Sequence, residues 1–195
     1  MLDQYNLSLL TKKLKIAPLN IVRENAELEI LNAIAQSELA TKIIFYGGTA
    51  LRLAFGSPRY SEDLDFLMVK NVSAKELNSA LFRLTTDNKD IFIKDIKDKR
   101  NTLFSLINIK NPTLKHPLNI KIEIAKRKNG IQYEHIPLAS PCSDLKPIVP
   151  TITIESLERL KAIAVKKRNE PRDWFDLWYI TKLLKKPWKP PLEFP

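Results

Sequence analysis

The sequence predicts an α+β fold, in which helices at both ends of the chain flank a centre of mixed helices and strands. Two patterns favour this fold. Apolar residues recur at helical spacing over 1–40 and again after residue 153, and they alternate with polar residues over 118–125. The 195 residues, 44% of them hydrophobic, are enough to bury the core of one domain. Because no apolar run is long enough to cross a membrane, we expect no membrane partner.

The N-terminal segment, residues 1–40, is predicted to form helices that pack on the core. Pro18 divides this segment into two parts. The apolar set of the first part is Leu7, Leu9, Leu10, Leu14 and Ile16, and that of the second is Ile21, Ala26, Leu28, Ile30, Leu31, Ile34 and Ala35.

The central segment, residues 41–137, is predicted to hold the core sheet. Gly47-Gly48 ends a short apolar strand, and Ser73 is a candidate helix N-cap. Asn129-Gly130 is typical of a hairpin turn between the strands on either side of it. In chain order we expect a strand at 43–46, a helix at 49–55, a strand at 64–69, a helix at 73–84, and strands at 91–96, 103–109, 118–125 and 131–136.

The C-terminal segment, residues 138–195, is predicted to be a helical region. It opens with a connector that several prolines interrupt, and its tail at 187–195 is expected to be irregular. Between the connector and the tail we expect helices at 154–168 and 174–184. The connector prolines are Pro137, Pro141, Pro147 and Pro150.

The charge and the cysteine content of the chain indicate which class of partner and which cellular compartment to expect. The chain has 32 Lys and Arg against 22 Asp and Glu, a formal net charge of +10. Such a surface attracts polyanions, which favours nucleotides or nucleic acid without specifying either. Cys142 is the only cysteine, so no internal disulfide can form. A single thiol and a polar start suit a reducing compartment, and we expect a cytoplasmic protein.

A glycine turn and an acidic pair form the central constellation of the sequence. Gly47-Gly48-Thr49 is followed, fifteen residues after Gly48, by Asp63-Leu64-Asp65. Residues two apart in a strand share a face, so Asp63 and Asp65 can hold Mg²⁺, or Mn²⁺, between them. Two such ions would hold the attacking hydroxyl and the pyrophosphate leaving group of an in-line displacement. The Gly-Gly-Thr turn offers backbone N–H groups and a hydroxyl to a triphosphate.

Glu123 is the best candidate for a third metal-binding carboxylate. It lies on the alternating strand 118–125, together with Asn119 and Lys121 on the polar face. The alternative is a solvated strand face on which Glu123 pairs with Lys121 or Lys126. The residues alone leave both interpretations open.

Four segments together resemble the AbiEii/AbiGii toxin family of nucleotidyltransferases, a group that includes the MenT toxins. Their residues run through positions 43–182, most of the chain. The segments are Phe45-Tyr-Gly-Gly-Thr-Ala-Leu-Arg52, Arg59-Tyr-Ser-Glu-Asp-Leu-Asp-Phe66, Leu160-Lys-Ala-Ile-Ala164 and Arg168-Asn-Glu-Pro-Arg-Asp-Trp-Phe-Asp-Leu177. The combination is highly specific for the family.

The resemblance implies a polymerase-β-type nucleotidyltransferase core with a mixed sheet and added helices. It also implies a role for each matching residue. Asp63 and Asp65 would hold metal, Gly47, Gly48 and Thr49 the triphosphate, and Lys161 a phosphate of the nucleotide; Asp173 would be a further essential acid, and Arg59, Ser61, Arg172 and Asp176 would support the site. Without the resemblance, Asp173 and Asp176 also fit a capped helix with a surface ion pair, and Lys161 fits a solvated lysine.

The resemblance further implies a toxin that transfers a nucleotide from a nucleoside triphosphate to an acceptor, with a cognate antitoxin as partner. The basic surface favours the 3′ end of an RNA such as tRNA as the acceptor, which would block translation. Two alternatives stay open at this point. The acceptor can be a protein hydroxyl or a small molecule, or the chain can be a catalytically silent module that binds RNA or a partner.

Overall fold

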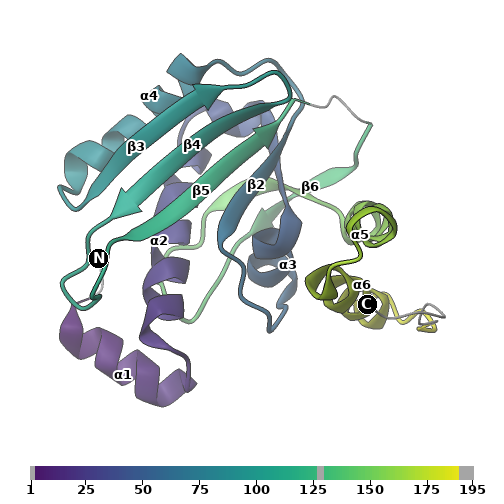
Figure 1. Cartoon of the computed structure of the whole chain (residues 1–195), viewed down its shortest axis with the longest axis horizontal. Coiled ribbons are helices and arrows are strands. Elements are labelled where there is room, and N and C mark those ends of the chain that lie inside the picture. Colours follow the sequence, from purple (N-terminus) through teal and green to yellow (C-terminus); the bar gives the residue numbers. More distant parts are fainter. Residues whose placement is uncertain (1–2, 127–129, 189–195) are drawn as a thin grey trace.

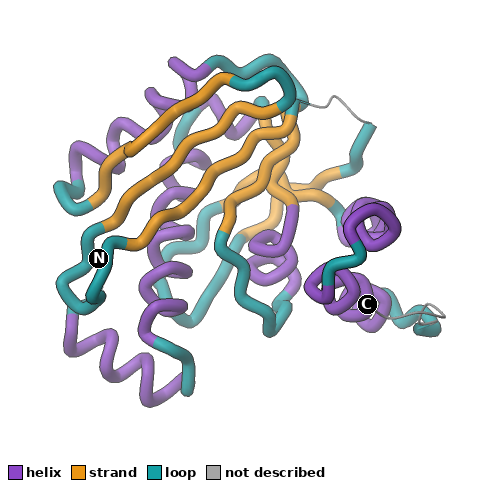
Figure 2. The backbone as a smooth tube through the Cα atoms, viewed as in Figure 1, coloured by secondary structure: helices purple, strands orange, loops and turns teal. Residues whose placement is uncertain are grey.

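The computed structural model describes residues 3–126 and 130–188, and its elements follow the predicted order (Figures 1 and 2). Helices lie at both ends and strands in the middle. The elements are α1 (Gln4–Leu14), α2 (Pro18–Ala35), the short 3-10 helix η1 (Glu38–Thr41), β1 (Ile43–Tyr46), α3 (Gly47–Phe55), β2 (Asp63–Met68), α4 (Ala74–Asp87), β3 (Ile91–Asp98), β4 (Thr102–Ile109), β5 (Leu118–Ala125), β6 (Tyr133–Pro137), β7 (Ile148–Ile152), α5 (Ile154–Arg168) and α6 (Pro171–Leu183).

The strands form one mixed sheet, in the order β3-β4-β5-β2-β1-β7-β6. Two neighbouring pairs, β2 with β5 and β1 with β7, run parallel. The remaining neighbours run antiparallel. The predicted α+β fold with a mixed sheet is therefore confirmed. Because β2 is a central strand, neighbours on both sides hold the backbone that carries Asp63 and Asp65.

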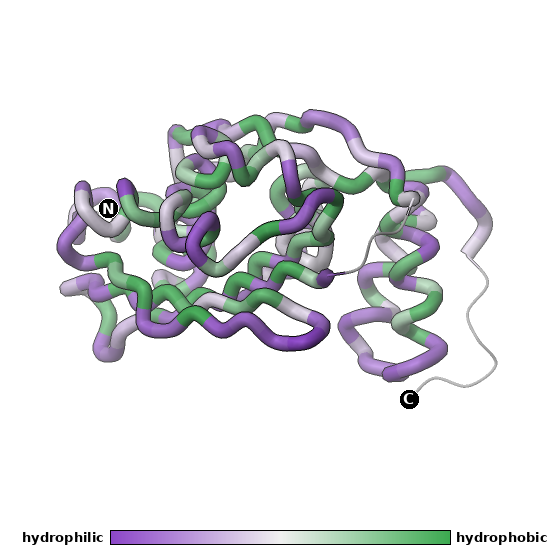
Figure 3. Tube along the Cα trace, turned by 90° about the horizontal axis from the view of Figure 1, so that it is seen from above, coloured by the Kyte–Doolittle hydropathy of each residue, from purple (hydrophilic) through white to green (hydrophobic). Residues whose placement is uncertain are grey.

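The two faces of the sheet are covered differently. Helices α2 and α4 pack on one face, where the larger apolar core includes Phe45, Phe66 and Ile122. A smaller core on the other face joins β1, β2 and β7 to α3, α5 and α6 through residues such as Leu67 and Ile180. In the view from above, α5 and α6 stand beside the sheet as a separate pair (Figure 3). They therefore cover only the β1–β2–β7 part of this face.

Local signals in the sequence account for several helix ends. The Ser73 side chain accepts a hydrogen bond from the Glu76 N–H, and the Glu76 side chain accepts one from the Ser73 N–H, so the predicted cap at Ser73 is confirmed as a capping box. Helix α6 begins at Pro171, three residues before the predicted start, because proline suits the first turn of a helix. Helix α3 begins at Gly47, so the glycine turn is itself the first turn of that helix.

The predicted hairpin between 118–125 and 131–136 is wrong. Strand β6 does not follow β5 in the sheet but lies at the opposite edge, where its partner is β7. Strand β7 was predicted to be part of the proline-rich connector, yet residues 148–152 belong to the sheet. Pro150 is accommodated in an antiparallel pair with His135. Of the predicted turn, Asn129 lies outside the described residues, as does the tail from residue 189.

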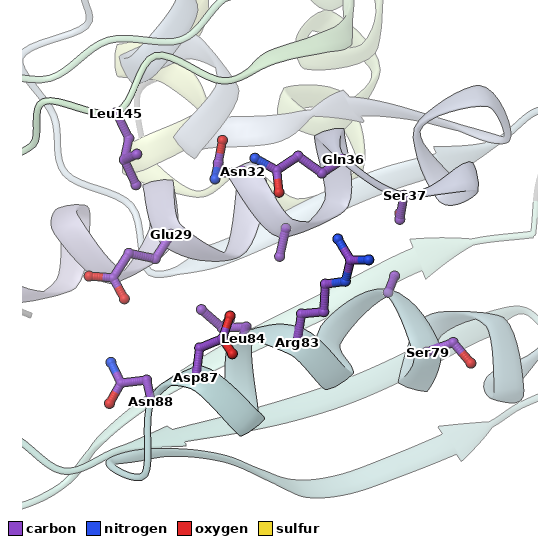
Figure 4. A pocket seen from close by; sticks show the side chains of 12 residues that line it. Glu29, Asn32, Gln36, Ser37, Ser79, Arg83, Leu84, Asp87, Asn88 and Leu145 are labelled. Carbon is purple, nitrogen blue, oxygen red and sulfur yellow. The ribbon is translucent and has the colours of Figure 1, made fainter.

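A polar groove of about 410 Å³ lies between α2 and α4 (Figure 4). Its lining includes Glu29, Asn32, Gln36 and Arg83. Because α2 and α4 cover the face of the sheet opposite to Asp63 and Asp65, this groove is remote from the acidic pair. In the described part of the chain, no helix has the length and apolar character needed to cross a bilayer.

Candidate active site

Asp63 and Asp65 lie at the start of β2 with their side chains on the same face of the sheet, as their spacing predicts. The parallel strand β5 places Lys121 opposite Asp63 and Glu123 opposite Asp65. On the other side, β1 places Tyr46 opposite Asp65. Since cross-strand partners share a face, three carboxylates and one ammonium group meet on the face that α5 and α6 partly cover.

The glycine turn lies directly against the acidic pair. Gly47 has φ of +90°, and a β-carbon there would lie 2.6 Å from Oδ2 of Asp65. At Gly48 a β-carbon would lie 2.6 Å from Nη2 of Arg59 and 2.7 Å from Oγ of Ser61. Both positions therefore need glycine, the first for its backbone conformation as well as for space. Arg59 and Ser61 thus lie beside the glycine turn, and their supporting roles stay predictions.

The glycine turn forms the N-terminus of α3. Tyr46, at the N-cap, makes no side-chain hydrogen bond to the first turn. The free N–H groups of a helix start carry partial positive charge and favour phosphate oxygens. The Thr49 hydroxyl donates a 2.6 Å hydrogen bond to the backbone carbonyl of Asp63, and its contact with a triphosphate stays a prediction. In this arrangement Thr49 holds the start of β2 beside the glycine turn.

We expect Gly47→Ala to reduce nucleotide transfer by about 10²-fold or more, because a misplaced reacting group is expected to lose about that much rate. The new methyl group pushes Asp65 aside, and φ of +90° strains an alanine backbone. Gly130→Ala is the matched control, since nothing lies within 4 Å of a β-carbon at that position. Initial rates at saturating nucleotide would test this. Equal rates for the two variants would show that Asp65 tolerates displacement.

Burial and two neighbouring carboxylates raise the proton affinity of Asp65. Burial, followed by the negative charges of Asp63 and Glu123, raises the pKa of Asp65 to about 6. Lys121 and Lys161 act in the opposite direction and lower it. Nζ of Lys121 lies 2.9 Å from Oδ2 of Asp63 and 3.8 Å from Oε2 of Glu123. The negative charge of the three carboxylates therefore exceeds the positive charge that the neighbouring lysines supply.

Glu123 combines both interpretations that the sequence leaves open. It lies opposite Asp65, and it also contacts Lys121. Over residues 3–126 and 130–188, no three His, Cys, Asp or Glu side chains are grouped as a ready-made metal site. A metal role for Glu123 stays a prediction. From the sequence, Lys121 was predicted only as a possible partner of Glu123. Its position two residues before Glu123 on the same strand was the signal that both side chains lie on the face of the site.

Helices α5 and α6 contribute a buried ion network. Asp173 and Asp176 are both fully buried. Nζ of Lys161 lies 3.2 Å from Oδ1 of Asp173 and 2.6 Å from Oδ2 of Asp176. Nε and Nη2 of Arg59 donate to the two carboxylate oxygens of Asp176 at 2.7 and 2.8 Å. The surface ion pair that α6 alone would suggest is therefore replaced by a network linking α5 and α6 to the loop before β2.

Lys161 lies near enough to Asp65 to lower its pKa, and Asp173 contacts Lys161. Their catalytic roles stay predictions. Lys161 is 9% exposed and acts on Asp65 electrostatically. Asp173 contacts Lys161 and Arg168, so it positions cations around the site. The predicted supporting residue Arg172 is exposed on α6, and Arg168 supplies the guanidinium group that contacts Asp173. Arg168 is the first residue of the family-like segment 168–177, although no role was predicted for it.

A second buried network holds α3 in place. The Arg52 guanidinium pairs with Glu24 of α2 and donates a 2.9 Å hydrogen bond to the carbonyl of Ser57. The same guanidinium lies over the Tyr60 ring, 3.6 Å from its centroid. The sequence predicted from the apolar residues of α2 that this helix packs on the core, and it predicted no role for Glu24. These contacts connect α2, the glycine-turn helix and the loop that leads to Asp63.

The comparisons with known proteins agree with this geometry. The family model described as nucleotidyl transferase AbiEii toxin, Type IV TA system, matches residues 29–192. The chain belongs to this family. It is a nucleotidyltransferase, and the family implies a nucleotide substrate and an antitoxin partner. Among curated proteins the comparison found no match.

Three solved structures have the same fold. One is JHP933 from Helicobacter pylori, with a TM-score of 0.64 and 23% identity, covering 86% of this chain and 68% of that one. Another is a putative nucleotidyltransferase from H. pylori, with a TM-score of 0.57 and 23% identity, covering 80% and 66%. The third is MenT4, nucleotidyltransferase toxin Rv2826c from Mycobacterium tuberculosis H37Rv, with a TM-score of 0.66 and 16% identity, covering 90% and 64%. The predicted nucleotidyltransferase fold is thereby confirmed.

Proposed function

We propose that this AbiEii-family nucleotidyltransferase moves a nucleotide from a nucleoside triphosphate to the 3′ hydroxyl of an RNA such as tRNA, and so blocks translation. The observation that carries the proposal is the acidic pair Asp63 and Asp65 on one face of β2, packed against the Gly47-Gly48 turn at the start of α3. Carboxylates beside a phosphate-binding helix terminus suit a reaction at the α-phosphate of a bound triphosphate.

The donor set fits a divalent cation. Asp63, Asp65 and Glu123 lie close enough together for their charges to raise the pKa of Asp65, and a bound cation relieves this repulsion. Mg²⁺ usually binds through one or two carboxylates and fills its remaining positions with water and phosphate oxygens. Asp63 and Asp65 would therefore hold Mg²⁺ or Mn²⁺, with Glu123 as a further candidate ligand. Such a cation supplies charge stabilisation for the attacking and leaving oxygens.

The protein's own groups position the nucleotide. Gly47 and Gly48 form the first turn of α3, Gly47 beside Asp65 and Gly48 beside Arg59, and the backbone N–H groups of a helix start suit phosphate oxygens. Lys161 is held by Asp173 and Asp176, so its ammonium group is already oriented before substrate arrives. A preorganised cation stabilises developing phosphate charge without reorganising during the reaction. We therefore assign Lys161 to the phosphates and Asp173 to positioning Lys161.

An RNA acceptor agrees with the charge of the molecule. The net charge is +10. Lys166 and Lys167 are exposed at the C-terminal end of α5, the helix that also carries Lys161. Lysines close to the site can neutralise backbone phosphates of an incoming RNA.

The test uses purified protein with total tRNA, Mg²⁺ and each α-³²P-labelled nucleotide in turn, for wild type and Asp65→Ala. We expect label in RNA with wild type, loss of label in the variant, and loss of label in EDTA that added Mg²⁺ restores. A translation extract preincubated with wild type and the preferred nucleotide should stop synthesising protein. Label on a protein band would replace the RNA acceptor by a protein hydroxyl. No label, with RNA retained equally by both forms, would indicate a silent binding module.

A further inference from the structure

Strands β3, β4 and β5 expose a face of the sheet on which no helix of the described chain is packed. Their opposite face carries Ile91, Ile107 and Ile120, which belong to the core under α2 and α4. Helices α5 and α6 lie beyond β2, at the other half of the sheet (Figures 1 and 3). This surface, here called the open face, is the direct continuation of the face that carries Asp63 and Asp65.

The strand register places two aromatic rings on the open face, and one of them lies in the same row as Asp65. Phe104 lies opposite Glu123, which lies opposite Asp65. Phe104 is therefore two strands, or about 10 Å, from Asp65 along one row of the sheet. Phe92 lies further out on β3, opposite Asn108. Phe92 lies outside the row of Asp65, because Asn108 is four residues further along β4 than Phe104. Together the two rings line a path over the open face from the outer strand β3 toward the carboxylates.

A lysine ammonium group lies over each of these rings. Nζ of Lys99 lies 4.8 Å from the centroid of Phe104, and Nζ of Lys110 lies 5.4 Å from that of Phe92. Phe92 is 38% exposed, although it is an apolar side chain in a regular strand. An accessible ring next to a cation suits a nucleotide, because the base stacks on the ring while the ammonium group pairs with a phosphate.

A pair of amide side chains completes the open face. Nδ2 of Asn108 donates a 2.9 Å hydrogen bond to Oδ1 of Asn119, and Asn119 is exposed. Asn119 shares its face of β5 with Lys121 and Glu123. An asparagine amide has further donor and acceptor capacity, which suits the edge of a base or a ribose hydroxyl.

We propose that the open face binds the single-stranded 3′ end of the acceptor RNA, with bases stacked on Phe92 and Phe104 and the terminal ribose directed at Asp63 and Asp65. This inference rests on the proposed function and adds the place and the mode of acceptor binding. A base-paired RNA does not fit the same surface, because its bases are stacked on one another and present no free ring face. The open face therefore selects for an unpaired end.

The test measures binding of a fluorescein-labelled RNA with a short unpaired 3′ end, by anisotropy and without nucleotide. We expect Phe92→Ala and Phe104→Ala each to weaken binding by roughly 10-fold, since stacking on one ring contributes about that factor or more. Phe104→Leu keeps the apolar volume and replaces Phe104→Ala if that variant does not fold. Phe82→Ala on α4 is the matched control, because Phe82 is 60% exposed on the other side of the sheet.

Two further readouts make the result specific. Lys99→Gln and Lys110→Gln should each reduce the slope of log affinity against log salt by about 0.7 to 1. A blunt-ended RNA duplex should bind wild type and both phenylalanine variants equally.

The outcomes separate this inference from the proposed function. Unchanged affinity in the phenylalanine variants, or no binding of the RNA by wild type, overturns the inference. Unchanged RNA affinity with weaker capture of the cognate antitoxin would also overturn it, and would assign the open face to a protein. Weaker binding in the variants supports the inference even if wild type labels no RNA, in which case the proposed function alone fails.

Discussion

Asp65→Asn is expected to abolish nucleotide transfer and, at the same time, to make the protein without bound metal more stable. The loss of activity follows from the place of Asp65 between Asp63, Glu123 and the glycine turn. A neutral amide attracts a divalent cation less strongly than a carboxylate does, and it has no negative charge to neutralise the cation. Removing a single group that stabilises transition-state charge costs about 10²–10³ in rate, so we expect a loss of at least that size. Asp63→Asn should lose activity as well.

The gain in stability follows from the raised pKa of Asp65. Burial and the charges of Asp63 and Glu123 disfavour the ionised carboxylate. The pKa rises from 3.8 to about 6, and each unit corresponds to about 1.4 kcal/mol of differential interaction between the two protonation states. Because the side chain retains some contact with solvent, we expect Asp65→Asn to raise the free energy of unfolding by roughly 1–3 kcal/mol near neutral pH.

The gain should depend on pH in a definite direction. Below about pH 4, Asp65 is protonated in both the folded and the unfolded protein, so wild type and Asp65→Asn differ least. Between about pH 4 and 6 the unfolded state releases the proton while the folded state keeps it, and wild type loses stability as pH rises. Asp65→Asn has no such proton. The difference in unfolding free energy therefore grows across this window and is constant above it.

Urea unfolding of both proteins in EDTA, at several pH values, measures this difference. Asp90→Asn is the control, because Asp90 is an exposed carboxylate outside the site. A variant no more stable than wild type at pH 7 would show that the three carboxylates do not repel one another in the folded state. With saturating Mg²⁺ and nucleotide the order should reverse, since ligands stabilise only the protein that binds them.

Asp176→Ala is expected to destabilise the protein by about 3–5 kcal/mol, the usual effect of removing one partner from a buried ion pair. Asp176 is fully buried and contacts both Arg59 and Lys161. Without it, two cations lose a shared counter-ion. The network also joins α6 to the loop before β2, so the helix pair should separate more readily from the sheet. Transfer activity should fall too, because Lys161 is no longer held toward Asp65.

Asp98→Ala is the matched control for Asp176→Ala. Asp98 also pairs with a lysine, Lys126, but its side chain is 52% exposed, so we expect an effect below about 1 kcal/mol. Urea unfolding of the two variants measures the loss of unfolding free energy in each. Equal losses would mean that the network around Asp176 contributes no more than a surface pair. A double-mutant cycle of Arg59→Gln and Asp176→Asn would then measure the coupling directly.

Much of the secondary structure could be predicted because its causes are local. The alternation over 118–125 predicts β5 with the observed bounds, and Ser73 as an N-cap predicts the start of α4. Each of these signals lies within a few residues of sequence, where side-chain direction and capping follow from backbone geometry.

The sheet order required the tertiary structure. Strand β6 pairs with β7 at the edge of the sheet, away from its neighbour in sequence β5. Pro150 argued against a strand at this position, since proline removes a backbone donor. Pairing between distant segments depends on how the whole core packs, and no local pattern over 126–152 reports it.

The sequence by itself determined the family, most of the helical and strand segments and the identity of the acidic pair. Only the tertiary structure decided which charges share the site. It brought Lys121 to Asp63, joined Arg59 to Asp176 across 117 positions, and buried Asp173 and Asp176, which α6 alone would leave as surface acids. The physical reason is that burial and charge pairing arise between elements. A carboxylate acquires its pKa and its partners from the strands and helices that pack against it.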